Sequence, residues 1–102
     1  GSVTIIANPN VPAAPTGFVR VGTTGFSLKW GTPEDNFWKS RLFRGTTTSF
    51  ADASFIKDVA GIAGQVSTAT DTPGAGTWRY WVVAMNGSSV ASLPTGPVTI
   101  TI

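Results

Sequence analysis

The sequence predicts an all-β domain, a seven-stranded antiparallel β-sandwich, and two observations carry this prediction. Short β-rich segments recur with turn signals about every 8–12 residues, which is the spacing of sandwich strands. Residues 77–85 form the strongest segment, with large apolar groups on both faces and an Asn-Gly reversal immediately afterwards. No segment shows the apolar period of a long helix.

Each element follows from local composition. In Phe26–Trp30, apolar residues alternate with polar ones, as in a half-buried strand. Prolines punctuate residues 8–15, which favours an extended connector and excludes a helix. Residues 51–60 fit either a short helix or a strand at the sheet edge. The expected strands are residues 2–6, 16–21, 26–30, 37–44, 65–70, 77–85 and 90–102.

The end of the chain predicts a hairpin. Asn86-Gly87 suits a type I′ turn, because both residues tolerate positive φ. Pro94 and Pro97 interrupt the returning strand, which indicates an edge position or a bulge. Ser-Val-Thr-Ile-Ile at 2–6 is similar to Pro-Val-Thr-Ile-Thr-Ile at 97–102, so residues 2–6 are either the closing strand of an upstream neighbour or an unrelated β-rich segment.

Side-chain alternation divides the strand at 77–85 into two faces. The even-numbered face is expected to join the core. The odd-numbered face also carries aromatic bulk, so it is expected either to pack against another segment or to bind a partner. The predicted core residues are Phe26, Leu28, Trp30, Leu42, Trp78, Tyr80, Val82 and Ala84.

Composition argues against catalysis. The chain of 102 residues has no histidine and no cysteine, so the commonest general base, metal ligand and nucleophilic thiol are missing. The five carboxylates show neither calcium-loop spacing nor an evident facing pair. We therefore expect no enzyme activity, no catalytic residue, no metal and no cofactor. Asn86-Gly87-Ser88 fits a glycosylation acceptor, but we interpret it as a turn.

Charge and hydropathy also limit the partners. The net charge of +2 is too small to argue for nucleic acid. No apolar run approaches the roughly 20 residues that cross a bilayer, so we expect no membrane embedding.

Four motifs lie between Pro15 and Ile102: Pro-Thr-Gly-Phe at 15–18, Phe-Ser-Leu-Lys-Trp at 26–30, Arg-Leu-Phe-Arg at 41–44 and the run from Gly76 to Asn86. With these motifs the chain resembles a fibronectin type III domain, an immunoglobulin-like sandwich. The resemblance implies that Trp30 is the buried tryptophan of the second strand. Trp78 departs from the pattern, because family members usually place there a tyrosine whose hydroxyl ties the corner loop to the backbone. The integrin-binding Arg-Gly-Asp tripeptide of the family is also missing, so cell adhesion is not carried over.

The style of the sequence is similar to the bacterial and bacteriophage branch of that family. The marks are its richness in Thr, Ser, Gly and Ala, together with Thr-Asp-Thr-Pro at 70–73 and Ala-Gly-Thr-Trp at 75–78. Domains of that branch are often attached to phage tail or capsid proteins and to secreted polysaccharide-degrading enzymes. The resemblance therefore implies a virion or extracellular location, with neighbouring domains or virion proteins as partners.

One surface is a candidate for binding. If the third and penultimate strands are neighbours, a cationic rim surrounds aromatic and apolar groups, an arrangement that can bind protein, glycan or an acidic polymer. The alternatives are that arginine and lysine stems cover Trp81, that residues 9–15 or 45–64 pack over it, or that the patch contacts another domain. The candidate residues are Lys39, Arg41, Phe43, Arg79, Trp81 and Val83.

Three functional hypotheses follow. The first is a non-catalytic structural module of a larger extracellular or virion protein, giving spacing, decoration or weak attachment, with a phage tail or capsid component foremost. The second is a recognition domain for a bacterial surface glycan or a protein around Trp81. The third is an accessory domain of a secreted carbohydrate-active enzyme. In each, residues 1–15 are expected to hold tag residues, a short strand and a proline-rich linker, and residues 16–102 the domain.

Overall fold

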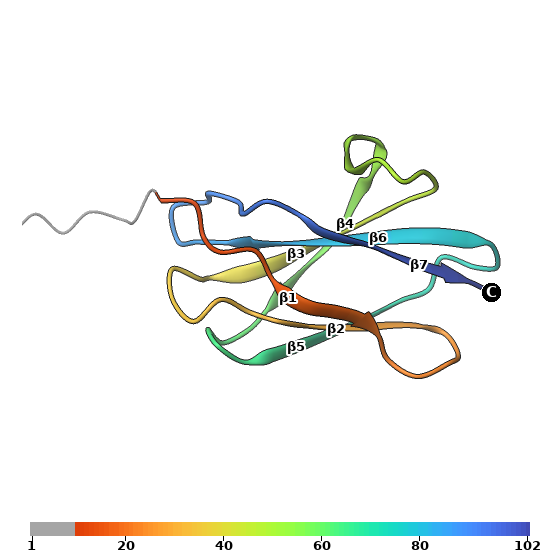
Figure 1. The fold of residues 1–102 in the computed structure, drawn as a ribbon, viewed down its shortest axis with the longest axis horizontal. Helices are drawn as coiled ribbons and strands as arrows, with labels where there is room; N and C mark the ends of the chain where they lie inside the picture. Colours follow the sequence, from red (N-terminus) through yellow and green to blue (C-terminus); the bar gives the residue numbers. More distant parts are fainter. Residues whose placement is uncertain (1–9) are drawn as a thin grey trace, which may run out of the picture.

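The computed structural model describes residues 10–102, so the predicted strand at 2–6 lies outside the described residues. It contains seven strands and one 3-10 turn, arranged as two packed layers (Figure 1). The elements are β1 (Thr16–Arg20), β2 (Phe26–Gly31), β3 (Lys39–Gly45), η1 (Phe50–Asp52), β4 (Ser54–Ala60), β5 (Val66–Asp71), β6 (Thr77–Met85) and β7 (Thr95–Thr101).

The strands form two antiparallel sheets, which confirms the predicted seven-stranded β-sandwich. One sheet has the order β1-β2-β5 and the other β4-β3-β6-β7. Residues 51–60, for which the sequence allowed a short helix or an edge strand, contain the end of the 3-10 turn η1 and then β4, which lies at a sheet edge. The last strand starts after Pro94, and β7 lies at an edge with a register irregularity beside it, as the prolines indicated.

The core lies between the sheets. Leu28, Trp30, Leu42, Tyr80 and Val82 are at most 1% exposed. Phe26 and Ala84 are also buried, and Trp78 packs against the core from a partly buried position. Neighbouring strands therefore supply interlocking apolar faces, as the alternation along each strand requires.

A buried hydrogen bond accompanies the central tryptophan. The indole Nε1–H of Trp30 donates to Ser40 Oγ on the opposite sheet, at 2.8 Å. Ser40 is fully buried, so this contact satisfies two polar groups that water cannot reach.

A polar cluster also links the two sheets. Asp71 at the end of β5 accepts hydrogen bonds from Arg44 Nη1 of β3 (2.6 Å) and from the Tyr80 hydroxyl of β6 (2.9 Å). Burial alone would raise the pKa of Asp71, but the hydrogen bonds from Arg44 and Tyr80 outweigh it and the pKa is lowered. Burial and the bond to Asp71 raise the pKa of Tyr80. This cluster fixes the sheets to each other at one side of the core.

Trp78 keeps a tie from β6 to the corner loop. Its indole Nε1–H donates to the carbonyl oxygen of Gly74, four residues upstream, at 3.2 Å. The Arg44 guanidinium lies 4.8 Å from the centre of one of its rings. An indole N–H thus makes a side-chain-to-backbone bond like the one expected of a tyrosine hydroxyl at this corner.

The hairpin after β6 differs from the predicted type I′ turn. That turn needs positive φ at both central residues, whereas Ser89 has φ of 60° and neither Asn86 nor Gly87 has positive φ. Asn86 O accepts from Ser89 N, and Asn86 N donates to Val90 O, so the loop has three residues with a left-handed third. The Asn86 side chain decides this geometry, since its Oδ1 accepts from the backbone N–H groups of Ser88 and Val90.

The connector that leads into β1 packs against the domain from residue 10. Pro12 and Pro15 are buried, and Asn10 O accepts hydrogen bonds from the side-chain amides of Asn36 and Asn86. The chain enters at one end of the sandwich, and its C-terminus lies at the other (Figure 1).

Candidate functional site

The residues predicted as a binding surface come together on the outer face of the four-stranded sheet. The register between β3 and β6 pairs Phe43 with Trp81 and Arg41 with Val83. Lys39 lies two residues before Arg41 on β3, and Arg79 lies two residues before Trp81 on β6. The adjacency that the sequence predicted is therefore present.

The centre of this face is buried. Trp81 and Val83 are each 3% exposed, and Met85 on the same face is 5% exposed. Of the possibilities for this face, Trp81 and Val83 therefore fit a covered surface and not a free one. Among the alternatives, the one in which residues 45–64 pack over Trp81 agrees with the structure, because Phe50 contacts the indole.

The covering of Trp81 is aromatic. Phe50 of η1 contacts the indole edge to face, with ring centroids 5.9 Å apart, and also contacts Phe43 at 5.0 Å. Phe43 in turn contacts Phe55 of β4 at 6.2 Å. The loop between β3 and β4 thus brings Phe50 onto the sheet and builds a second apolar cluster outside the sandwich core, which we call the outer cluster: Phe43, Phe50, Phe55 and Trp81.

Two glycines allow the backbone to approach the indole. Gly96 has φ of +139°, and a Cβ there would lie 2.8 Å from Trp81 Cδ1 and 2.6 Å from Tyr80 O. A Cβ on Gly45 would lie 3.5 Å from Trp81 Cζ3 and 3.3 Å from Ala53 Cα. Any side chain at Gly96 would therefore displace the indole, which explains why the second residue of β7 is a glycine.

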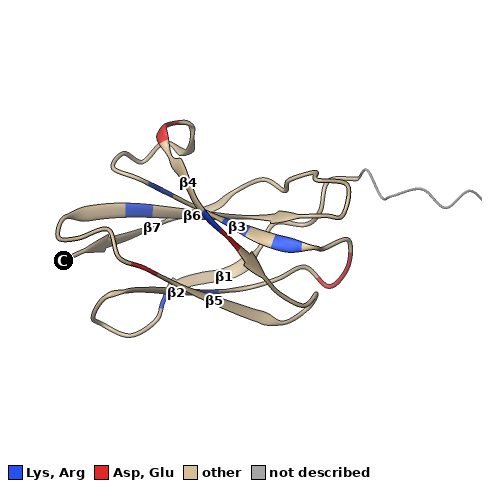
Figure 2. Cartoon of the chain, turned by 180° about the vertical axis from the view of Figure 1, so that it is seen from behind, with Lys and Arg blue, Asp and Glu red and all other residues tan. Residues whose placement is uncertain are grey.

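The cations of the predicted rim are mostly engaged within the domain. Figure 2 marks where Lys, Arg, Asp and Glu lie along the strands. Asp58 of β4 bridges Lys39 Nζ and Arg41 Nε, each at 2.8 Å. The hydrogen bond from Arg41 is the main cause that lowers the pKa of Asp58 and, reciprocally, raises that of Arg41. Because these side chains are partly exposed, the bridges contribute little to stability, about 0–1 kcal/mol each.

Arg79 is held by the covering loop. Its Nη1 donates to the carbonyl oxygen of Thr46 at 2.7 Å, while its Nε is buried and has no hydrogen-bond partner within residues 10–102. The guanidinium thus helps to fix the β3–β4 loop over the outer face.

Sequence reasoning missed the aromatic side chains that remain accessible. Trp38 is 50% exposed with Lys39 Nζ 4.0 Å from its ring centre, and Phe55 is 53% exposed with the Arg41 guanidinium 5.0 Å from its ring centre. The cation–π pairs partly occupy both rings. Trp38 precedes the first residue of β3, so the alternation along that strand does not determine its exposure.

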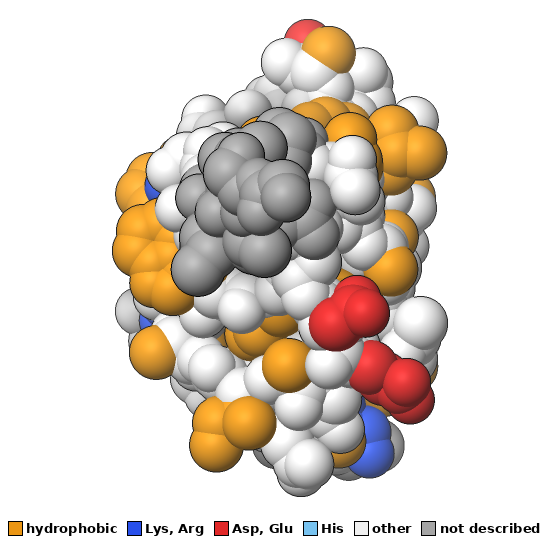
Figure 3. Space-filling view, turned by 90° about the vertical axis from the view of Figure 1, so that its left-hand side faces the viewer, with side chains coloured by type: hydrophobic (Ala, Val, Ile, Leu, Met, Phe, Trp, Pro, Cys, Tyr) orange, Lys and Arg blue, Asp and Glu red, His pale blue; other side chains and the backbone are white. Residues whose placement is uncertain are grey.

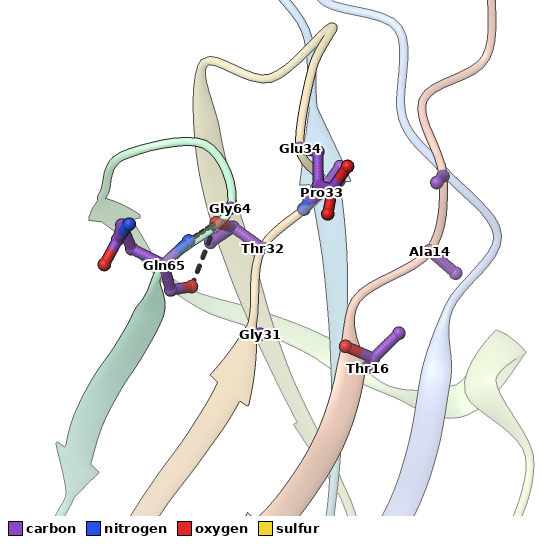
Figure 4. A pocket seen from close by; sticks show the side chains of 9 residues that line it. Ala14, Thr16, Gly31, Thr32, Pro33, Glu34, Gly64 and Gln65 are labelled. Carbon is purple, nitrogen blue, oxygen red and sulfur yellow. Dashed lines mark hydrogen bonds between the residues drawn. The ribbon is translucent and has the colours of Figure 1, made fainter.

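A hollow lies at the end where the chain enters. It has a volume of about 410 Å³ and is lined by the start of β1, the end of β2 and the β4–β5 loop (Figure 4). The Thr32 hydroxyl donates to Ile62 O at 2.6 Å and accepts from Gln65 N at 3.1 Å, so this hydroxyl is engaged with the backbone of the β4–β5 loop. Acidic side chains gather at one side of this end (Figure 3), where the β2–β3 loop carries exposed Glu34 and Asp35.

The described residues contain no group of three or more His, Cys, Asp or Glu side chains that could hold a metal ion. Within the same part of the chain, no helix is long and apolar enough to cross a membrane.

Comparison with known proteins bears on the fold. The solution structure of the fibronectin type-III domain of human fibronectin type III domain containing protein 3 is similar to this chain, with a TM-score of 0.54 and 21% sequence identity. The match covers 99% of this chain and 91% of that chain. No family model and no curated protein matches. The chain therefore has the fibronectin type III fold, as its motifs predicted, and at this identity the likeness concerns the fold alone.

Proposed function

We propose that this chain is a non-catalytic structural module of a larger extracellular or virion protein, and specifically a bacteriophage tail or capsid component that gives spacing, decoration or weak surface attachment. The observation that carries the proposal is the closed outer face. The aromatic strand face that offered a recognition surface is covered by the chain's own loop, with Trp81 only 3% exposed.

The placement of the chain ends supports a spacing role. The entering chain and the C-terminus lie at opposite ends of the sandwich, so the domain adds length between whatever it joins (Figure 1). The phage assignment draws on the likeness of the sequence to the bacterial and bacteriophage branch, through its Thr/Ser/Gly/Ala richness and the motifs at 70–73 and 75–78.

A domain-replacement experiment tests the structural role. The parent protein is compared with a variant that lacks the domain and with one in which an unrelated β-sandwich of similar length replaces it. A spacer predicts that assembly fails or shortens on deletion and recovers on replacement. Loss of function in the replacement variant, despite normal assembly, would contradict the proposal.

A recognition domain is the second candidate, because Trp38 and Phe55 stay half exposed beside the Lys39–Asp58–Arg41 bridge. Exposed aromatic rings next to hydrogen-bonding charged groups suit a sugar or a protein partner. Titration of the full chain with bacterial-surface and plant-wall polysaccharides, followed by tryptophan fluorescence, tests this candidate. It predicts saturable binding that Trp38→Ala removes, whereas the structural role predicts no saturable change. Saturable binding to the plant-wall polysaccharides would favour the third hypothesis, an accessory domain of a secreted carbohydrate-active enzyme.

A further inference from the structure

The four edge strands of this sandwich differ in how they are protected against pairing with another chain. Natural edges are blunted by charges, prolines, bulges or a covering segment. β1 has a register irregularity and lies beside β7, with Thr95 Oγ1 donating to Pro15 O, and β7 carries Pro97. β4 carries Lys57 and Asp58 and has an irregular register with β3.

β5 carries none of these protections from Val66 to Ala69, and at its end Thr70 O meets a charged side chain, Lys57. It reads Val-Ser-Thr-Ala-Thr before Asp71, without lysine, arginine or proline, and it pairs with β2 in an unbroken register. Val and Thr have high strand propensity. β5 is therefore the edge most open to an added strand.

The register identifies which backbone groups of β5 face outward. Thr32 N donates to Gln65 O, which continues the β2–β5 register and makes the odd-numbered residues of β5 the ones hydrogen-bonded to β2. The N–H and C=O groups of Val66, Thr68 and Thr70 consequently point away from the sheet. Thr70 O agrees with this, because it accepts from Lys57 Nζ of the other sheet.

Space exists beside the first half of this edge. A groove of about 440 Å³ runs between the end of β4 and residues 65–68. Ile62 and Val66, which line it, are 72% and 68% exposed. An added strand would cover apolar surface as well as pair backbone groups.

We propose that β5 is a self-association edge, at which β5 of a second copy adds in antiparallel orientation about a two-fold axis and joins the two three-stranded sheets into one sheet of six. A register centred on Thr68 places Thr68 opposite Thr68 of the second copy and Val66 opposite Thr70. All three residues are hydrogen-bonding positions in this register, because their backbone groups face outward.

The sequence of β5 is complementary to itself in this register. Threonine faces threonine at the centre, a cross-strand pair that stabilises sheets, and valine faces threonine on either side. Asp71 would meet Gln65 of the second copy, so no like charges oppose each other. Thr70 O keeps its bond to Lys57, since a carbonyl oxygen accepts two hydrogen bonds. This self-complementarity favours a second copy over an unrelated peptide.

Single cysteines provide a selective test, because the chain has none of its own. A directly opposed, hydrogen-bonded pair has Cα atoms about 5.5 Å apart, within the range that a disulfide spans. Thr68→Cys should therefore form a covalent dimer under mild oxidation, while Thr99→Cys, an exposed threonine on the β7 edge, should remain monomeric. Equal crosslinking of both variants, or none at position 68, would overturn the proposal.

Sedimentation equilibrium from micromolar to millimolar protein gives an independent readout. The unmodified chain should show a concentration-dependent shift from monomer to dimer. Thr68→Lys, which sets two like charges face to face, should weaken the dimer by roughly tenfold or more, and Thr99→Lys should leave it unchanged. Circular dichroism checks that each variant is folded. A strictly monomeric unmodified chain, including one that binds only a separate extended peptide, would refute self-association. These outcomes do not depend on the proposed structural role, which the domain-replacement experiment tests separately.

Discussion

Replacement of Trp81 by alanine distinguishes a closed outer face from a recognition surface. Trp81 is 3% exposed and packs against Phe50, so its loss removes buried area and leaves a cavity. A buried tryptophan removes about 200 Å² from water, which at roughly 25 cal/mol per Å² gives an upper bound near 5 kcal/mol. We expect Trp81→Ala to lower the free energy of unfolding by about 3–5 kcal/mol.

Trp38 supplies the matched control, because it is also a tryptophan on this side of the molecule but is 50% exposed. Trp38→Ala should cost at most about 2.5 kcal/mol by the same area rule, since half of its surface is already in water and no cavity forms. Urea denaturation followed by circular dichroism measures both values. A cost below about 1 kcal/mol for Trp81→Ala, or equal costs for the two variants, would refute the reasoning that Trp81 belongs to a second apolar cluster.

Three further predictions concern the ties between elements. Because the pKa of Asp71 is lowered in the folded chain, its contribution to stability is present above the unfolded carboxyl pKa of about 3.9 and is lost as the pH falls through the lower folded pKa. The free energy of unfolding should therefore fall more steeply in acid for the unmodified chain than for Asp71→Asn. Parallel curves of unfolding free energy against pH would contradict this. Ser40→Ala leaves the buried indole N–H of Trp30 unpaired and should cost about 1–3 kcal/mol in urea denaturation, against near-neutrality if the bond is absent. Trp78→Phe removes the bond to Gly74 O and should speed hydrogen exchange in residues 72–76; unchanged exchange there would show that the tie does not hold the corner.

The architecture was predictable because it depends on local patterns. Alternation in Phe26–Trp30 gives one apolar and one polar face, and the apolar face, which carries Leu28 and Trp30, is the one buried in the core. The burial of Trp81 was not predictable, because Phe50, which covers it, comes from a loop whose composition is compatible with several conformations. The turn after β6 was misjudged for a similar reason: the Asn86 side chain bonds the loop backbone, which outweighs the intrinsic preference of Asn-Gly.

For the candidate surface, too, the sequence predicted which strands are neighbours but not which side chains are covered. Strand adjacency brought Arg41 and Val83 together as expected from the resemblance. Alternation states which face a side chain occupies, but not whether another segment covers that face. The exposure of Trp38 does not follow from alternation, because this residue precedes the first residue of β3.

The contact between Phe50 and Trp81 is the most direct test of the closed outer face. The two rings meet edge to face with centroids 5.9 Å apart, so their ring protons lie close enough for nuclear Overhauser cross-peaks in a solution NMR spectrum. We predict cross-peaks between the Trp81 indole and the Phe50 ring, together with slow solvent exchange of the Trp81 backbone amide. An indole without contacts to Phe50, exposed to a soluble paramagnetic probe, would contradict the account.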